Sequence, residues 1–197
     1  MLYSDLSQYT HEQLSNFTYE QLSNFTYEQL ELMGQMKLIT DRTLADVDRW
    51  KELRDKGWAN MSEAERREWM GEINVSPSAA KGMYTHNDLN RVESAVGNIV
   101  KMLEKSGIDV PKMVIKTDWT YRDKLLESDV ERYFSNISVL RGLFDVYKNT
   151  PRVPRITDNL TFTLANNIEK ILMDVEEIAI RTIGFRYYSG EIFLGEV

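Results

Sequence analysis

The chain has 197 residues, of which 42% are hydrophobic and 28% charged, and its formal net charge is −7. This composition is typical of a globular protein with a sizeable core, and the negative charge disfavours binding to nucleic acid or to an anionic membrane, since both attract basic surfaces. Because the sequence contains no cysteine, disulfides, thiolate nucleophiles and cysteine-ligated metal sites are excluded.

The first feature along the chain is an eight-residue repeat, which occurs between residues 9 and 32 as YTHEQLSN, FTYEQLSN and FTYEQLEL. A period of eight suits neither one amphipathic helix, whose apolar stripe would rotate by about 80° per unit, nor an alternating strand. Each unit instead has the pattern of a short helix, with Thr at the N-cap, Gln three residues later, and an aromatic residue and a Leu at hydrophobic-staple spacing. We therefore predict that residues 1–38 form an arm of stacked short helices, the alternative being one long helix.

The aromatic residues of this arm and of the C-terminal segment are the candidate partner-binding residues. The arm can pack on its own domain, on a second copy of the chain or on a foreign partner. The C-terminal segment has two apolar stretches around Ser189 and Gly190, a pattern that favours a β-hairpin with an edge for a partner strand. The candidate residues are Tyr9, Phe17, Tyr19, Phe25, Tyr27, Tyr187, Tyr188 and Phe193.

Residues 39–197 carry ordinary helix signals and predict a helical bundle. N-cap patterns at Thr43, Ser62, Thr85 and Ser128 each open a helix, and a last long helix begins near residue 161. We therefore expect a mostly α protein with three long helices, two shorter ones and the repeat arm.

Two stretches of this region give more specific predictions, the helix after Thr85 and residues 110–115. The helix that begins after Thr85 has apolar residues spaced 4, 3 and 4 apart, as one buried face requires. These residues are Val92, Val96, Ile99 and Leu103. Residues 110–115 are apolar enough for a short strand, but Pro111 restricts them to a sheet edge or a loop.

No pattern of residues indicates catalysis or a bound cofactor. His86 and Asp88 have a spacing that invites a metal site, but both are explained as the start of a helix, where Asp88 complements the helix dipole. Carboxylate pairs are frequent, and we interpret them as solvated helix faces rather than as the acid pair of a cell-wall hydrolase. The sequence has no phosphate-binding glycine loop, no G-x-S-x-G and no H-E-x-x-H. We therefore predict no catalytic, cofactor-binding or metal-binding residues, and no enzyme activity.

Polar residues beside the apolar helix faces have a structural interpretation. Asn90 and Arg91 lie in one helix, and Asn166 and Asn167 in another. We predict that they form a buried hydrogen-bond network, which would fix how the helices pack against one another. We also predict that Trp119 is an anchor of the core.

Several stretches resemble a family of proteins that prophages of Gram-positive, mainly gut-associated bacteria encode, often near tail genes. They are residues 39–47 (ITDRTLADV), 88–93 (DLNRVE), 116–119 (KTDW), 165–172 (ANNIEKIL), 188–191 (YSGE) and 195–197 (GEV). The repeat arm is similar to T-x-E-x-L repeats that precede this block in such proteins. The resemblance implies a virion-associated or tail-associated structural protein, and it implies no chemical role for any residue.

These observations favour a phage structural or adaptor protein that acts through protein–protein contacts. Its partners would be other tail components or further copies of itself, the latter giving a homo-oligomer, and we expect no nucleic acid and no membrane. The alternative is a cytoplasmic regulatory or host-interaction module that does not enter the virion, and a cell-wall hydrolase ranks third. The N-terminus shows no secretory signal, so we expect synthesis in the cytoplasm, followed in the leading hypothesis by association with the virion.

Overall fold

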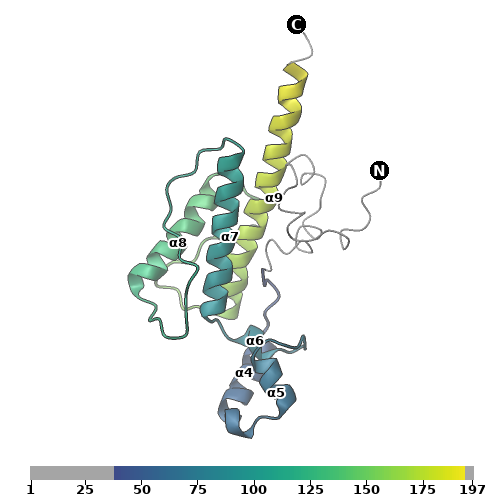
Figure 1. Cartoon of the computed structure of the whole chain (residues 1–197), viewed down its shortest axis with the longest axis vertical. Helices are drawn as coiled ribbons and strands as arrows, with labels where there is room; N and C mark the ends of the chain where they lie inside the picture. Colours follow the sequence, from purple (N-terminus) through teal and green to yellow (C-terminus); the bar gives the residue numbers. More distant parts are fainter. Residues whose placement is uncertain (1–37, 194–197) are drawn as a thin grey trace, which may run out of the picture.

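The computed structural model describes the backbone of residues 38–193 and the side chains of residues 38–183. The described part of the chain is mostly helical and contains no strand, which confirms the prediction of a mostly α protein (Figure 1). The elements are α4 (Leu44–Lys56), η2 (Trp58–Asn60), α5 (Glu63–Trp69), α6 (Ala79–Gly82), α7 (His86–Lys105), α8 (Glu127–Gly142) and α9 (Phe162–Phe193).

The first four of these elements form a small lobe below the bundle in Figure 1. The N-caps predicted at Thr43 and Ser62 are confirmed, each as a capping box that opens α4 or α5, and Gly57 ends α4 with a φ of 76°. The lobe has its own small core. It consists of Leu53, Met61 and Ala79, against which Trp50 and Trp69 stack with their ring centroids 6.5 Å apart.

Helices α7, α8 and α9 lie side by side and form a three-helix bundle (Figure 1). The predicted apolar face of α7 is confirmed, because all four of its residues are buried. Apolar side chains of α8 and α9 complete this core, which is contiguous along the bundle. The main contributors are Val92, Val96, Ile99, Leu103, Ile137, Leu140, Ile168, Ile171, Leu172 and Val175.

The structure corrects one local prediction, the start of α8, and decides between the two alternatives left open for residues 110–115. Helix α8 begins one residue before Ser128, with Leu126 as its N-cap, and the Asp129 carboxylate accepts a hydrogen bond from the Leu126 amide at 3.2 Å. Residues 110–115 form a loop and not a strand. A backbone acceptor of this loop bonds to side chains and not to a neighbouring strand, because the Val114 carbonyl accepts hydrogen bonds from Arg132 and Asn136.

The C-terminal hairpin is not confirmed, because α9 continues as a helix through Ser189 and Gly190 to Phe193. One glycine costs a helix only about 1 kcal/mol, and no proline interrupts the segment, so the helix can propagate from the bundle. Tyr187, Tyr188 and Phe193 therefore lie on helical backbone, and their side chains are outside the described residues.

The repeat arm also lies outside the described residues, as do its candidate residues Tyr9, Phe17, Tyr19, Phe25 and Tyr27. Their role in partner binding stays a prediction. The same holds for the domain boundary between residues 38 and 39, where the described chain begins.

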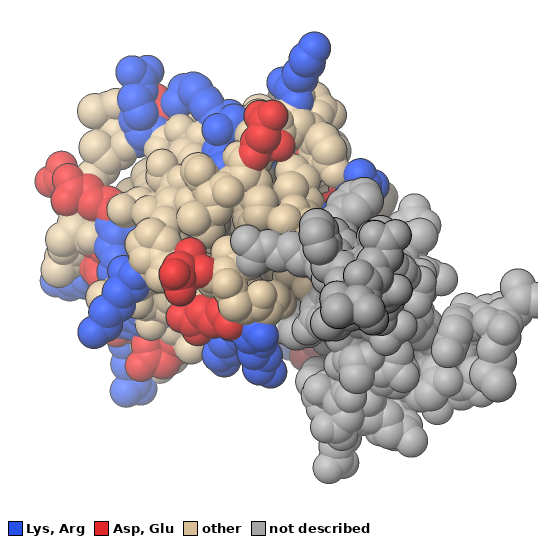
Figure 2. Space-filling view, turned by 90° about the horizontal axis from the view of Figure 1, so that it is seen from above, with Lys and Arg blue, Asp and Glu red and all other residues tan. Residues whose placement is uncertain are grey.

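The outer surface carries charges of both signs. Figure 2, which views the molecule from above, shows basic and acidic side chains interspersed around a centre of uncharged residues. Among the described residues on this face, basic side chains form no extended patch of the kind that nucleic acid attracts. Within the part of the chain that was searched, no helix combines the length and the apolar character that crossing a bilayer requires.

Candidate functional site: an aromatic groove

A cavity of about 670 Å³ opens between the N-terminal ends of α7 and α8 and the loops that precede α8 and α9. We call it the aromatic groove. Its lining is mainly apolar and comes from four separate stretches of the chain. The lining residues are Met83, Tyr84, Thr85, His86, Leu89, Trp119, Thr120, Tyr121, Asp123, Leu125, Val130, Tyr133, Phe134, Ile156, Asp158, Leu160 and Ile168. A cavity of this size with few polar groups is typical of a binding site.

Large apolar side chains remain exposed at the rim of the groove. Tyr121 is 75% exposed, Leu125 50% and Leu160 49%, and Ile156 is 37% exposed. The four residues come from two loops that are distant in sequence but border one cavity. Exposed apolar residues gathered around a hollow mark a contact surface more often than scattered ones do.

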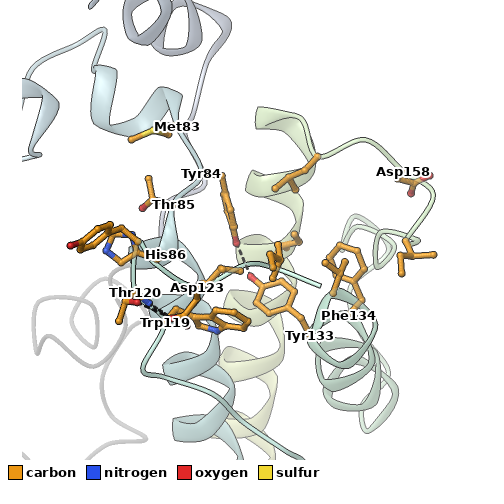
Figure 3. A pocket seen from close by; sticks show the side chains of 17 residues that line it. Met83, Tyr84, Thr85, His86, Trp119, Thr120, Asp123, Tyr133, Phe134 and Asp158 are labelled. Carbon is orange, nitrogen blue, oxygen red and sulfur yellow. Dashed lines mark hydrogen bonds between the residues drawn. The ribbon is translucent and has the colours of Figure 1, made fainter. Parts of the chain in front are cut away.

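Two tyrosines close the inner part of the groove. The hydroxyl groups of Tyr84 and Tyr133 lie 2.6 Å apart and share a hydrogen bond, and Figure 3 shows the two side chains pointing toward each other. Burial raises the pKa of both phenols above the ordinary value of 10. Both therefore stay protonated at neutral pH, and the groove has a neutral floor.

The polar groups of the groove lie nearer its edges, with His86, Thr120 and Asp123 on one side and Asp158 on the other (Figure 3). Hydrogen bonds from the Thr120 amide and hydroxyl lower the pKa of Asp123, and the charges of Lys116 and His86 add to this effect. Hydrogen bonds from Arg155 and Arg152 lower the pKa of Asp158. Both carboxylates are therefore ionised at neutral pH, and both already have partners.

The loop that carries Trp119 is fastened to α7 by a reciprocal pair of hydrogen bonds. The Trp119 amide donates to Asn90 Oδ1 at 2.8 Å, and Asn90 Nδ2 donates to the Trp119 carbonyl at 2.9 Å. The Trp119 side chain is 4% exposed, and the Lys116 ammonium lies 4.0 Å from the centre of its ring. The indole therefore forms a fixed wall of the groove, as the prediction of a core anchor requires.

A buried carboxylate, Glu93 of α7, holds the same loop from beneath. It accepts two hydrogen bonds of 2.7 Å from the Arg132 guanidinium, one from the Lys116 amide at 2.8 Å and one from Trp119 Nε1 at 3.2 Å. Because Arg132 belongs to α8, this one carboxylate joins α7, α8 and the loop between them. The bidentate contact with the Arg132 guanidinium compensates the charge of Glu93 and offsets the free-energy cost of burying it.

A second buried set of charges lies behind the groove, and we call it the ion-pair cluster. It consists of Arg42, Asp88, Arg91 and Glu169. Glu169 is fully buried and accepts hydrogen bonds from Arg42 at 2.7 Å, from Arg91 at 2.8 and 3.0 Å, and from the Ile39 amide. The two positive and two negative charges balance, and together they join the segment before α4 to α7 and α9.

The ion-pair cluster contacts two residues that line the groove, Thr85 through Asp88 and Tyr84 through Arg42. The Asp88 carboxylate caps α7 by accepting hydrogen bonds from the Thr85 amide and hydroxyl at 2.6 and 3.1 Å. The Arg42 guanidinium lies 5.5 Å from the centre of the Tyr84 ring. The position of Tyr84 and Thr85, two lining residues, therefore depends on this cluster.

The predicted polar network is confirmed in part. Asn90, Arg91 and Asn166 form hydrogen bonds between segments distant in sequence, although they are half-buried and not buried, and the role of Asn167 stays a prediction. Asn166 exchanges two hydrogen bonds with the Arg42 backbone, at 3.1 and 2.9 Å.

The interpretation of the carboxylate pairs as solvated was wrong for four residues, which are all buried: Asp46, Glu68, Asp174 and Glu176. Asp46 accepts a hydrogen bond from the Ser78 amide, Glu68 from the Arg49 guanidinium, and Asp174 from the Thr150 hydroxyl.

His86 lies at the groove as the start of α7, as predicted, and among the described residues no set of three His, Cys, Asp or Glu side chains is placed to bind a metal ion. Comparisons with models of protein families, with curated proteins and with solved structures found no match to the chain.

Proposed function

We propose that the protein is an adaptor without catalytic activity, and that the aromatic groove is the surface through which it binds an apolar segment of another protein. The observation that carries this proposal is the exposed apolar rim around a preformed aromatic cavity. Aromatic pockets that take up an apolar anchor supply most of the binding energy at protein interfaces. The phage tail, which the sequence resemblance suggests, is the assembly in which we propose that this contact is made.

The walls of the groove support a docking role because they are fixed in advance. The reciprocal pair of hydrogen bonds with Asn90 and the two hydrogen bonds that Lys116 and Trp119 donate to Glu93 hold the Trp119 loop on α7. A site that is already ordered loses little conformational entropy when a partner binds.

Selection from a random 12-residue peptide library on the immobilised full-length chain tests the proposal. We expect the recovered peptides to bind less tightly to a Leu125→Asp variant, by at least about tenfold, which corresponds to about 1.4 kcal/mol. The matched control is Val114→Asp, because Val114 is 67% exposed and does not line the groove. If both variants bind the selected peptides like the unchanged protein, the groove is not the docking surface.

The place of action needs a separate measurement. Mass spectrometry of purified phage particles from a lysogen that carries the gene should detect the chain in a fixed ratio to the tail proteins. Its absence from the particles, together with its presence in the cytoplasm, would instead support the regulatory or host-interaction role.

A further inference from the structure

We infer that the aromatic groove has an internal ligand, namely one unit of the octapeptide repeat of residues 9–32 of the same molecule. This inference rests on the proposed function, since it requires the groove to bind protein segments. It adds what the groove recognises, an aromatic residue followed by an acidic and an apolar one.

The chemistry of the repeat matches the groove in its apolar part. Each unit has an aromatic residue at its first position and a leucine five residues later. The groove offers one cavity of about 670 Å³ walled by aromatic rings, with a second apolar surface at Leu125 and Leu160 on its rim. One aromatic anchor in the cavity and one leucine on the rim would cover the apolar side chains that the structure leaves exposed.

The charges are also complementary. Residues 116–126 and 151–161, the two loops that border the groove, together carry five basic and three acidic residues, although the whole chain has a net charge of −7. Residues 1–37 carry five acidic residues and one lysine, and each repeat unit has a glutamate three residues after its aromatic. The two carboxylates that line the groove, Asp123 and Asp158, are already paired with Lys116, Arg152 and Arg155. The glutamate of a bound repeat unit would therefore be directed away from them and toward the basic residues Arg122 and Lys124 of the bordering loop, which fixes the orientation of the unit.

The described chain begins at Leu38, close enough to the groove for a repeat unit of the same molecule to reach it. Leu38 and Ile39 line a second hollow of about 1140 Å³, and Met83, Thr85 and His86 line both this hollow and the groove. Phe25, the first residue of the third repeat unit, is 13 residues from Leu38, which an extended chain spans over at most about 45 Å. A tethered ligand of this reach has an effective concentration of about millimolar, so even a weak contact within one molecule would be populated.

The absence of cysteine from the chain allows a direct test, because two introduced cysteines have no competitor. The test pair is Thr26→Cys in the third repeat unit with Asn159→Cys, between the lining residues Asp158 and Leu160. The control pair is Thr26→Cys with Asn60→Cys in η2, an exposed residue that lines neither the groove nor the hollow beside Leu38. Both pairs are made in the full-length chain and oxidised at low protein concentration.

We expect the disulfide of the test pair to form within one molecule at least about tenfold faster than that of the control pair. Replacing the anchors in the test pair, Tyr9→Ser, Phe17→Ser and Phe25→Ser together, should reduce its rate to that of the control. Equal rates for the two pairs would overturn the inference, and so would a test-pair disulfide that is insensitive to the serine substitutions.

A product that is mainly a disulfide-linked dimer would also overturn it, because the occupant would then be the arm of a second copy. The selected peptides keep this result separate from the proposed function. If they bind the groove while the test pair fails, the groove is a docking surface for a foreign partner and the internal ligand does not exist.

Discussion

The buried carboxyl group of Glu176 gives the sharpest quantitative prediction. Glu176 lies on α9 and is 7% exposed, and no basic side chain among the described residues forms an ion pair with it. Burial raises its pKa from 4.5 to about 7. It thus differs from Glu93 and Glu169, whose charges are compensated by arginines.

The sign of the effect on stability follows from the two pKa values. Below about pH 4.5 the carboxyl is protonated in the folded and the unfolded chain, and its ionisation does not change the free energy of unfolding. Between about pH 4.5 and 7 only the unfolded chain gives up the proton, so the free energy of unfolding falls as the pH rises. Above about pH 7 the loss is complete, and the difference between the pKa values corresponds to roughly 3 kcal/mol.

Glu176→Gln removes the ionisable group and keeps its size. Urea unfolding followed by circular dichroism should show the variant more stable than the unchanged protein by roughly 3 kcal/mol at about pH 8 and by about 1 kcal/mol at about pH 5. The control is Glu177→Gln, which removes a partly exposed carboxylate paired with Arg181 and should change stability by less than about 1 kcal/mol at either pH. Equal effects of Glu176→Gln at the two pH values would refute the reasoning.

Two substitutions test other contacts. Glu169→Gln leaves Arg42 and Arg91 with Asp88 as their only carboxylate in the ion-pair cluster, so the free energy of unfolding should fall by about 3–5 kcal/mol. Gly82→Ala would place a Cβ atom 2.1 Å from the Asp46 carbonyl oxygen, and forcing α6 away from α4 should cost about 1–3 kcal/mol. Both values come from urea unfolding. Gly142→Ala, whose Cβ meets nothing within 4 Å, should be neutral or slightly stabilising, and a loss as large as that of Gly82→Ala would contradict the steric argument.

The elements that local rules govern could be predicted from the sequence. The capping boxes at Thr43, Ser62 and Thr85 depend on residues three apart, and the 4, 3, 4 stripe of α7 depends on one helix alone. The start of α8 was predicted wrongly because serine is a favoured N-cap residue and leucine is not, whereas the N-cap is Leu126, whose amide donates to the Asp129 carboxylate.

The buried carboxylates could not be predicted, because their partners are distant in sequence. Arg42 and Glu169 are 127 residues apart, and Glu93 and Arg132 are 39 residues apart. Glu169 follows Ile168 directly, so its place beside the apolar stripe was visible, but nothing local shows that an arginine would meet it.

The groove could not be predicted from the sequence either, because its walls come from four stretches that only the folded chain brings together. One signal in the sequence was available. Tyr121, Leu125, Ile156 and Leu160 are large apolar residues that lie outside every predicted helical stripe. Apolar residues in loops either fill a core or remain exposed for a partner, and in this chain they border one cavity.

The ion-pair cluster is explained better by its role in positioning residues of the groove than by its contribution to the free energy of unfolding. A buried set of balanced charges contributes little net free energy compared with apolar residues of the same volume, and its main effect is to allow only one arrangement of the segments that carry it. Here those segments are the entry to α4, the start of α7 and the first turns of α9, which meet behind Tyr84 and Thr85. Because both residues also line the groove, the geometry of the candidate docking surface is set by charges that lie outside its lining.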